Sequence, residues 1–192
     1  MTDYRRNSAA GYGFFFERLS VIQQGDGFRK GSTHPTGCQS NHIPVRPVLR
    51  KATAYLRKNR IVICPISDTT DGVGIVSLPI FDIDVNDLSG LGQATLAALE
   101  HSKKQVPHPA LNEWNELFDP VLKATGDKSW NTFSRSAKNV IIRFETNRVV
   151  FVPTKNLGPR DGFSPLFEKE RSSAPTVGEV GAALKASFGD AE

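Results

Sequence analysis

A short segment of this chain occurs twice, and the repeat limits the folds that the sequence can adopt. Residues 59–65 read NRIVICP and residues 147–153 read NRVVFVP, so each copy is a β-branched apolar run that a proline closes. A glycine follows each proline by nine residues, at Gly74 and at Gly162. The pattern predicts one β-rich scaffold that is built twice.

Each copy continues into an apolar segment of helical character, residues 91–94 in the first copy and residues 177–180 in the second. Neither copy carries a nucleophile, a paired carboxylate or a metal-binding cluster at matching positions. A scaffold that is duplicated without duplicated chemistry indicates a binding surface rather than an active site. We therefore expect no catalytic residue and no cofactor.

The length and composition indicate a globular protein of one domain, or of one domain with an extension. The chain has 192 residues, of which 39% are apolar and 23% are charged. Its apolar runs are far shorter than the roughly 18 residues that span a bilayer, and no signal-peptide core forms near the N-terminus. Two cysteines, Cys38 and Cys64, make a poor disulfide framework. We expect a cytoplasmic protein with no membrane partner.

The net charge of +4 conceals a strong asymmetry along the chain. Residues 1–60 hold 11 Lys/Arg and 3 Asp/Glu, residues 61–120 hold 2 and 9, and residues 121–192 hold 11 and 8. The three segments therefore carry +8, −7 and +3. The basic first segment could touch nucleic acid or a membrane surface, whereas the acidic middle segment predicts a partner that is itself basic.

We expect residues 1–45 to be a basic, flexible N-terminal extension, because Gly, Ser, Asn and Gln dominate them. Residues 46–192 then form the folded domain, in which residues 46–57 are an edge segment or a short basic turn of helix. Pro65 confines its strand to an edge or an end of a sheet. Strands are predicted at residues 60–66, 73–76, 78–85, 139–144, 148–153 and 165–170. Helices are predicted at residues 88–102, 110–125, 129–133 and 176–188.

Cap residues support several of these helix boundaries. Asp87 is suited to begin the first helix, and Gly126 is suited to end the second, which Pro120 kinks or divides. Thr176 and Glu179 have the spacing of a capping box before the last helix. The predicted fold class is α+β, with two pseudo-repeated antiparallel β-rich units, each followed by a helix, and a helical connector between them.

Two groups of residues resemble catalytic or metal-binding sites. His34, Cys38 and His42 are spaced by four, but Pro35 and Gly37 oppose the helix that would align them, so we expect no metal. Asp82 and Asp84 alternate with apolar residues, so both point to one face of a strand. Paired carboxylates can bind Mg²⁺ or transfer protons, but no third acidic residue or lysine stands at a nuclease-like spacing. Together with Asp68, Asp71 and Asp87 they predict a dense anionic surface.

The order and spacing of several short motifs resemble one known family. The motifs are GVGI at residues 72–75 with PIF at 79–81, LEHSK at 99–103 with VPHP at 106–109, and KSW at 128–130 with VPTKN at 152–156 and GF at 162–163. This set is similar to the immunity proteins of bacterial contact-dependent growth inhibition systems, a group long known only as a domain of unknown function. The resemblance covers about residues 46–190.

The resemblance implies a cytoplasmic protein that binds the C-terminal toxin domain of a CdiA-type effector and neutralises it without catalysis. Such toxins are frequently nucleases, including tRNases, and a basic nuclease would suit an anionic inhibitor surface. We therefore predict that the five aspartates, with Phe163 or Phe167 as an exposed aromatic anchor, contribute to toxin binding.

Two other functions stay open at this stage, and self-association is left open as well. The first is a module that binds single-stranded nucleic acid on a sheet platform, although strand aromatics do not interleave with basic residues. The second is a small hydrolase or nuclease that uses Asp82, Asp84 and His108. We expect no direct contact with nucleic acid.

Overall fold

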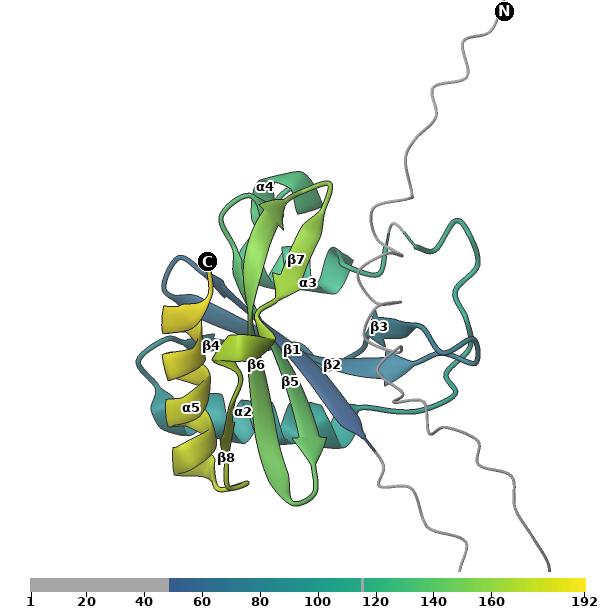
Figure 1. The fold of residues 1–192 in the computed structure, drawn as a ribbon. Coiled ribbons are helices and arrows are strands. Elements are labelled where there is room, and N and C mark those ends of the chain that lie inside the picture. Colours follow the sequence, from purple (N-terminus) through teal and green to yellow (C-terminus); the bar gives the residue numbers. More distant parts are fainter. Residues whose placement is uncertain (1–48, 115) are drawn as a thin grey trace, which may run out of the picture.

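The structure is a computed structural model that describes residues 49–114 and 116–192. In this part of the chain, eight strands form one sheet with antiparallel pairing throughout (Figure 1). The strands are β1 (Arg50–Arg57), β2 (Arg60–Asp68), β3 (Gly74–Val76), β4 (Phe81–Asp84), β5 (Lys138–Glu145), β6 (Arg148–Gly158), β7 (Gly162–Pro165) and β8 (Arg171–Ser173). The helices are α2 (Leu88–His101), α3 (Asp119–Thr125), α4 (Trp130–Ser134) and α5 (Val177–Asp190), with a 3-10 turn η1 (Phe167–Lys169).

Two equivalent units make up the sheet, and they meet along β1 and β5. The strand order is β3-β2-β1-β5-β6-β7, with β4 beside β2 and β8 beside β6. Each unit ends in a 14-residue helix, α2 or α5, and the connector between the units holds α3 and α4. The predicted α+β fold of two antiparallel units, each followed by a helix and joined by a helical connector, is confirmed.

The register of the central strands relates the two units by a pseudo-twofold axis. Thr53 of β1 lies opposite Ile141 of β5, and these positions are 88 residues apart. Asn59 and Asn147, which begin the two copies of the sequence repeat, have the same separation. Equivalent residues of two antiparallel strands face each other only where a twofold axis passes, so the axis lies between Thr53 and Ile141.

The two prolines of the repeat lie inside their strands, where each strand changes its outer partner. β2 pairs with β4 along its first half and with β3 along its last residues, and Pro65 lies between these pairings. Its carbonyl accepts a hydrogen bond from the Ser77 N–H, as the Pro153 carbonyl does from the Leu166 N–H, both at 2.9 Å. A missing N–H is tolerated at this gap in the ladder. The expectation that Pro65 marks an edge or an end is therefore wrong, because β2 continues to Asp68.

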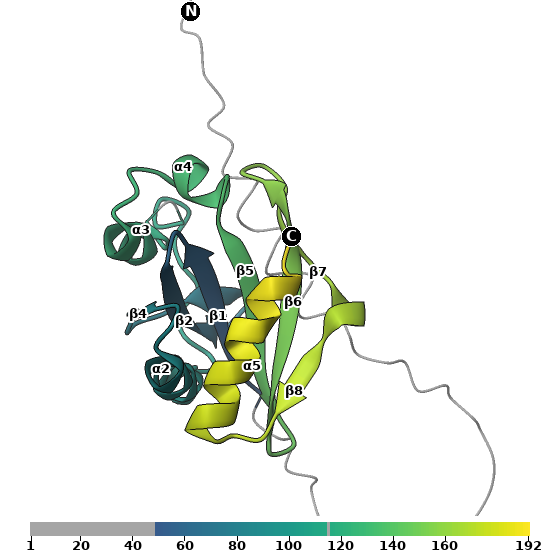
Figure 2. The ribbon, with the colours of Figure 1, turned by 90° about the vertical axis from the view of Figure 1, so that its left-hand side faces the viewer.

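The helices α2 and α5 lie side by side against one face of the sheet and touch through their backbones (Figure 2). A Cβ atom on Gly92 would lie 2.7 Å from the carbonyl carbon of Val177 and still closer to its oxygen. A Cβ atom on Gly181 would lie 2.9 Å from the carbonyl carbon of Leu88. These contacts are reciprocal, since residues 88 and 92 correspond to residues 177 and 181. Glycine is needed at both positions because the helices cross on the pseudo-twofold axis.

The reciprocal contacts correct the predicted pairing of the helical segments. Residues 91–94 correspond to residues 180–183, which are 89 positions later, and not to residues 177–180. The loops before the second helix differ in length from those before the first, so the repeat spacing changes from 88 to 89.

Buried apolar residues fill both faces of the sheet. The cluster under α2 and α5 includes Ala54, Ile61, Ile63, Leu91, Ile142, Phe151, Val180 and Leu184. The cluster on the opposite face includes Tyr55, Val62, Cys64, Phe118, Val121, Phe133 and Phe163. Successive residues of β2 alternate between the two clusters, so β2 is buried on both faces. The connector helices and β7 contribute to the second cluster.

Three other predicted elements differ from the structure. Residues 50–57 form β1, a central strand, and not an edge segment or a turn of helix. Only Asp119–Thr125 is helical within the predicted helix at 110–125, because Pro120 occupies the first turn, where its missing N–H costs nothing. Gly126 ends α3 at a φ of 71°, as predicted. The predicted strand at 165–170 contains the end of β7 and the turn η1.

Thr176 precedes α5 as predicted, but the capping box does not form. The Thr176 side chain makes no cap hydrogen bond. The Glu179 carboxylate accepts a hydrogen bond from the Ala174 N–H at 3.2 Å instead. The start of α5 is therefore tied to the chain before it through Glu179 rather than through Thr176.

Candidate functional site

Three of the five predicted carboxylates gather where β4 leads into α2. Asp82 and Asp84 are exposed on β4, whereas the alternate residues of this strand pack against the core under α2. Asp87 caps α2, since its Oδ1 accepts a hydrogen bond from the Gly90 N–H at 2.8 Å. The predicted alternation at Asp82 and Asp84 and the predicted cap at Asp87 are confirmed.

Two cations lie within this group or beside it. Lys185 of α5 donates from Nζ to Asn86 Oδ1 at 3.0 Å, in the turn between Asp84 and Asp87. Arg60 Nε is 2.9 Å from Asp82 Oδ1, and an Nη2 hydrogen bond reaches the Asp82 carbonyl at 2.9 Å. The hydrogen bond to Asp82 raises the pKa of Arg60. Asp84 accepts a hydrogen bond from the Asn86 N–H at 2.8 Å, and this neutral donor does not compensate the carboxylate charge.

The other two carboxylates lie at the opposite end of β2. Asp82 pairs with Val62, and Asp68 is six residues further along β2, which is roughly 20 Å at the rise of a strand. Asp68 Oδ1 is 2.8 Å from Lys51 Nζ, and its side chain is only 23% exposed. Asp71 is exposed in the loop that follows. The five aspartates therefore form two groups and not the single dense surface that we expected.

The two phenylalanines proposed as anchors have opposite environments. Phe163 is 3% exposed and packs against Tyr55 and Trp130, with ring centroids 5.9 and 6.4 Å away. The expectation that Phe163 is an exposed anchor is therefore wrong, because β7 turns this side chain into the core. Phe167 is 45% exposed at the start of η1.

His108 fastens the connector to the loop after β2. Its Nδ1 is 3.3 Å from Thr69 Oγ1 and 3.5 Å from Asp71 Oδ2, and its ring lies 5.3 Å from that of Trp114. Since Asp82 lies near the other end of β2, His108 and Asp82 cannot act on the same atom. The arrangement does not favour a hydrolase that uses both residues.

The sheet offers no exposed aromatic platform in the described part of the chain. Val62 and Val150 are fully buried on one face, and Ala54 and Ile142 are fully buried on the other. Single-stranded nucleic acid binds where bases stack on exposed aromatic side chains. The arrangement therefore does not favour the nucleic-acid-binding alternative.

The possible metal ligands His34, Cys38 and His42 lie outside the described residues. Within residues 49–114 and 116–192, no three His, Cys, Asp or Glu side chains are placed to hold a metal ion. Cys64 is fully buried in β2, and burial raises the pKa of its thiol. Cys64 therefore serves as a small apolar residue of the core.

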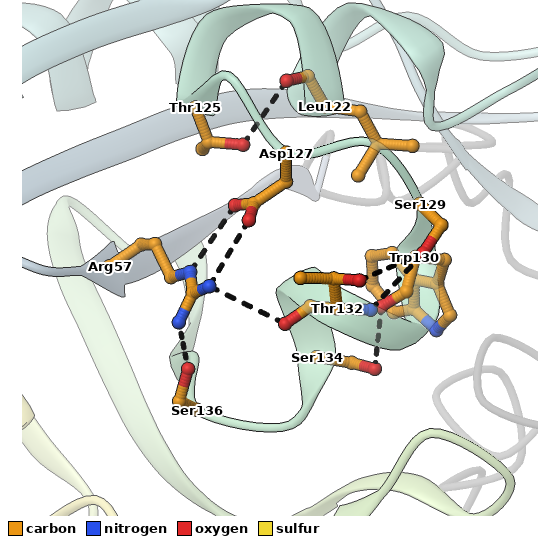
Figure 3. Close-up of polar contacts among 9 residues, drawn as sticks. All are labelled: Arg57, Leu122, Thr125, Asp127, Ser129, Trp130, Thr132, Ser134 and Ser136. Carbon is orange, nitrogen blue, oxygen red and sulfur yellow. Dashed lines mark hydrogen bonds and ion pairs between the residues drawn. The ribbon is translucent and has the colours of Figure 1, made fainter.

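An ion pair that the sequence did not predict holds the connector on the first unit (Figure 3). Arg57, at the end of β1, donates from Nε and Nη2 to the two carboxylate oxygens of Asp127 at 3.2 and 3.1 Å. The same guanidinium donates to Ser136 Oγ and to the Thr132 carbonyl. The hydrogen bond from Arg57 lowers the pKa of Asp127. Together these hydrogen bonds of Arg57 hold α3 and α4 in place relative to β1.

A shallow pocket between α3 and the segment before β4 is a second feature that the sequence did not predict. It has a volume of about 530 Å³ and is lined by Leu78, Ile80, Asp119, Pro120, Lys123 and Ala124. Leu78 is 66% exposed. One sign of this pocket is visible in the sequence. Leu78 follows the buried residues of β3 but is not part of that strand.

The fold is that of an α+β protein with two antiparallel units around a pseudo-twofold axis. No helix of residues 49–114 or 116–192 has the length and apolar character needed to cross a membrane. No protein-family model matches the sequence, and no curated protein matches it.

Solved structures of other proteins share this fold. NMB0488, a protein of unknown function from Neisseria meningitidis, matches with a TM-score of 0.63 and 14% identity, over 75% of this chain and 96% of that chain. A chain of the CdiA-CT/CdiI toxin and immunity complex from Yersinia pseudotuberculosis matches with a TM-score of 0.60 and 14% identity, over 75% and 98%. The predicted likeness to contact-dependent inhibition proteins therefore holds at the level of the fold.

Proposed function

We propose that this chain is an immunity protein that binds the C-terminal toxin domain of a cognate CdiA-type effector and neutralises it. It acts in the cytoplasm through a tight protein complex and catalyses no reaction. The toxin is a nuclease, such as a tRNase. The observation that carries the proposal is the shared fold with a chain of a toxin and immunity complex, because the likeness extends over 98% of that chain.

Two further observations support the proposal. The sequence motifs that resemble the immunity family are spread over both units and the connector between them. The exposed carboxylates of β4 and the start of α2 supply negative charge, which would attract a basic nuclease and orient its approach.

Co-expression with the protein encoded directly upstream tests the proposal. We expect the C-terminal domain of that protein to arrest growth when it is expressed alone. Co-expression of this chain restores growth, and the two proteins co-purify as a complex. An immunity protein from an unrelated pair is the control and gives no rescue. Growth arrest that this chain does not relieve, with no complex formed, contradicts the proposal.

Charge reversal tests the carboxylate groups separately. The double substitution Asp82→Lys and Asp84→Lys should weaken toxin binding by about tenfold and reduce its dependence on salt, because an interfacial charge that attracts the partner is lost. Loss of the Arg60–Asp82 pair should cost little stability, because the arginine side chain is 50% exposed. Titration calorimetry at low and high salt measures both effects.

The substitution Asp71→Lys tests whether the group of Asp68 and Asp71 contributes to toxin binding. Asp161→Lys, on the β6–β7 turn, is the matched control. We expect Asp161→Lys to bind like the wild type. Equal affinity and equal salt dependence for the wild type and the double variant would show that β4 does not face the toxin.

A further inference from the structure

We infer that the toxin domain docks on the first unit by placing an apolar side chain in the pocket beside α3, while basic residues around it face the carboxylates of β4. The inference rests on the proposed function and specifies the surface and the chemistry of the partner. It commits to a basic protein surface with one projecting aliphatic or aromatic side chain.

The pocket adjoins the carboxylates of β4. Ile80 lines the pocket and packs against the cluster that contains Val62, and Asp82 lies opposite Val62 on the same face of the sheet. Ile80 directly precedes β4, in which Asp82 and Asp84 are alternate residues roughly 7 Å apart. A partner that fills the pocket therefore also contacts Asp82 and Asp84, which follow Ile80 by two and four residues.

Comparison of the two units shows that the fold does not require these residues. Asp82 lies opposite Val62. Val150, which is 88 residues after Val62, lies opposite Ser172, so Ser172 is the equivalent of Asp82 in the second unit. The second unit thus keeps the same pairing without a carboxylate. The pocket also depends on α3, which belongs to the connector and packs on the first unit beside β2. Both the charge and the pocket are therefore additions to the duplicated scaffold.

The charge around the pocket selects a basic partner. Four carboxylates outnumber three cations on this surface, which leaves a net charge of −1 from Asp82, Asp84, Asp87, Asp119, Arg60, Lys123 and Lys185. A second copy of this chain docked symmetrically would bring the same negative charge against itself, which costs binding energy. A basic toxin domain brings the complementary charge. An apolar side chain that fills a pocket in an interface has the arrangement of a binding hot spot.

Substitution at Leu78 tests the inference. The probe is the purified C-terminal domain of the protein encoded directly upstream, and the measurement is titration calorimetry with the full chain. Leu78→Lys should weaken binding by about tenfold or more, because it places a charge in the pocket and repels a basic partner. Leu78→Ser removes only the apolar wall and should weaken binding several-fold. Both variants should keep the thermal midpoint of the wild type, because Leu78 is 66% exposed.

Matched controls lie on the second unit. Leu157 is 48% exposed on β6, so Leu157→Lys makes the same chemical change on another surface and should bind like the wild type. Phe167→Lys tests the other exposed anchor, and a larger loss there than at Leu78 would overturn the inference. A wild-type dimer that Leu78→Lys converts to a monomer without loss of toxin affinity would also overturn it.

The outcomes separate this inference from the proposed function. If the wild-type chain neither binds the toxin domain nor restores growth, the proposed function fails and the docking surface fails with it. If the wild type binds and both Leu78 variants bind equally well, only the docking surface is wrong.

Discussion

Replacing Gly92 with alanine is expected to lower the free energy of unfolding by about 3 kcal/mol or more, the upper range for overpacking in a core. The added Cβ would overlap the carbonyl group of Val177, whose carbon would be only 2.7 Å away. A backbone carbonyl cannot rotate out of the way as a side chain can. The helices must therefore move apart and loosen the cluster under them. Urea unfolding followed by circular dichroism measures the loss.

The pseudo-twofold axis provides both a second test and a control. Gly181→Ala makes the reciprocal clash with the carbonyl group of Leu88 and should cost a similar amount. Gly178 and Gly189 lie in α5, and an added Cβ there would meet no atom within 4 Å apart from adjacent residues and the backbone of the same helix. Their alanine variants should therefore keep the stability or raise it by up to about 1 kcal/mol, since alanine favours a helix. Similar stability for Gly92→Ala and Gly178→Ala would contradict the close crossing of α2 and α5.

The duplication could be predicted because it rests on local pattern. The residues that follow Asn59 and Asn147 alternate between the two faces of the sheet, and such β-branched runs predict strands without any tertiary information. The caps at Asp87 and Gly126 depend on a few adjacent residues and were predicted for the same reason. The exact pairing of the helical segments was missed because loops of different length shift the repeat.

The elements that sequence patterns missed depend on contacts between distant residues. β1 contains Ala52 and Ala54, which have low strand propensity, and the strand is stabilised by its neighbours β2 and β5. Pro120 was interpreted as a kink because its place in the first turn of α3 depends on where the helix starts. Tertiary packing determines the position of β1 and the start of α3, and the pattern of a single sequence does not reveal tertiary packing.

The candidate site was predictable only in part for the same reason. Alternation placed Asp82 and Asp84 on an exposed face, but sequence proximity could not show that Asp68 lies at the other end of β2. Phe163 looked like a loop aromatic, and the pairing of β7 with β6 buries it. The pocket at Leu78 joins segments about 40 residues apart, so its formation depends on the connector.

Removing the carboxylate of Asp127 is expected to lower the free energy of unfolding by about 2 kcal/mol, as for other hydrogen bonds to charged groups with little exposure. Asp127→Asn keeps the shape of the side chain but leaves Arg57 without its counter-ion. The two side chains are only 8% and 16% exposed, so water compensates little. The connector should also become more mobile, because Arg57 joins β1 to both Asp127 and Thr132. Hydrogen exchange of α3 and α4 measures that change.

The contribution of this ion pair should disappear in acid. The hydrogen bond from Arg57 holds the pKa of Asp127 below its usual value, so the folded protein binds this proton less readily than the unfolded chain does. The stabilisation is therefore complete above the unfolded pKa, near 4, and is lost as the pH falls through the lower folded pKa. The stability difference between wild type and Asp127→Asn should be constant from neutral pH down to about pH 5 and should shrink below pH 4. Asp161→Asn, an exposed control, should differ from wild type by less than about 0.5 kcal/mol. A difference at Asp127 that stays constant down to pH 2 would mean that its charge does not contribute to stability.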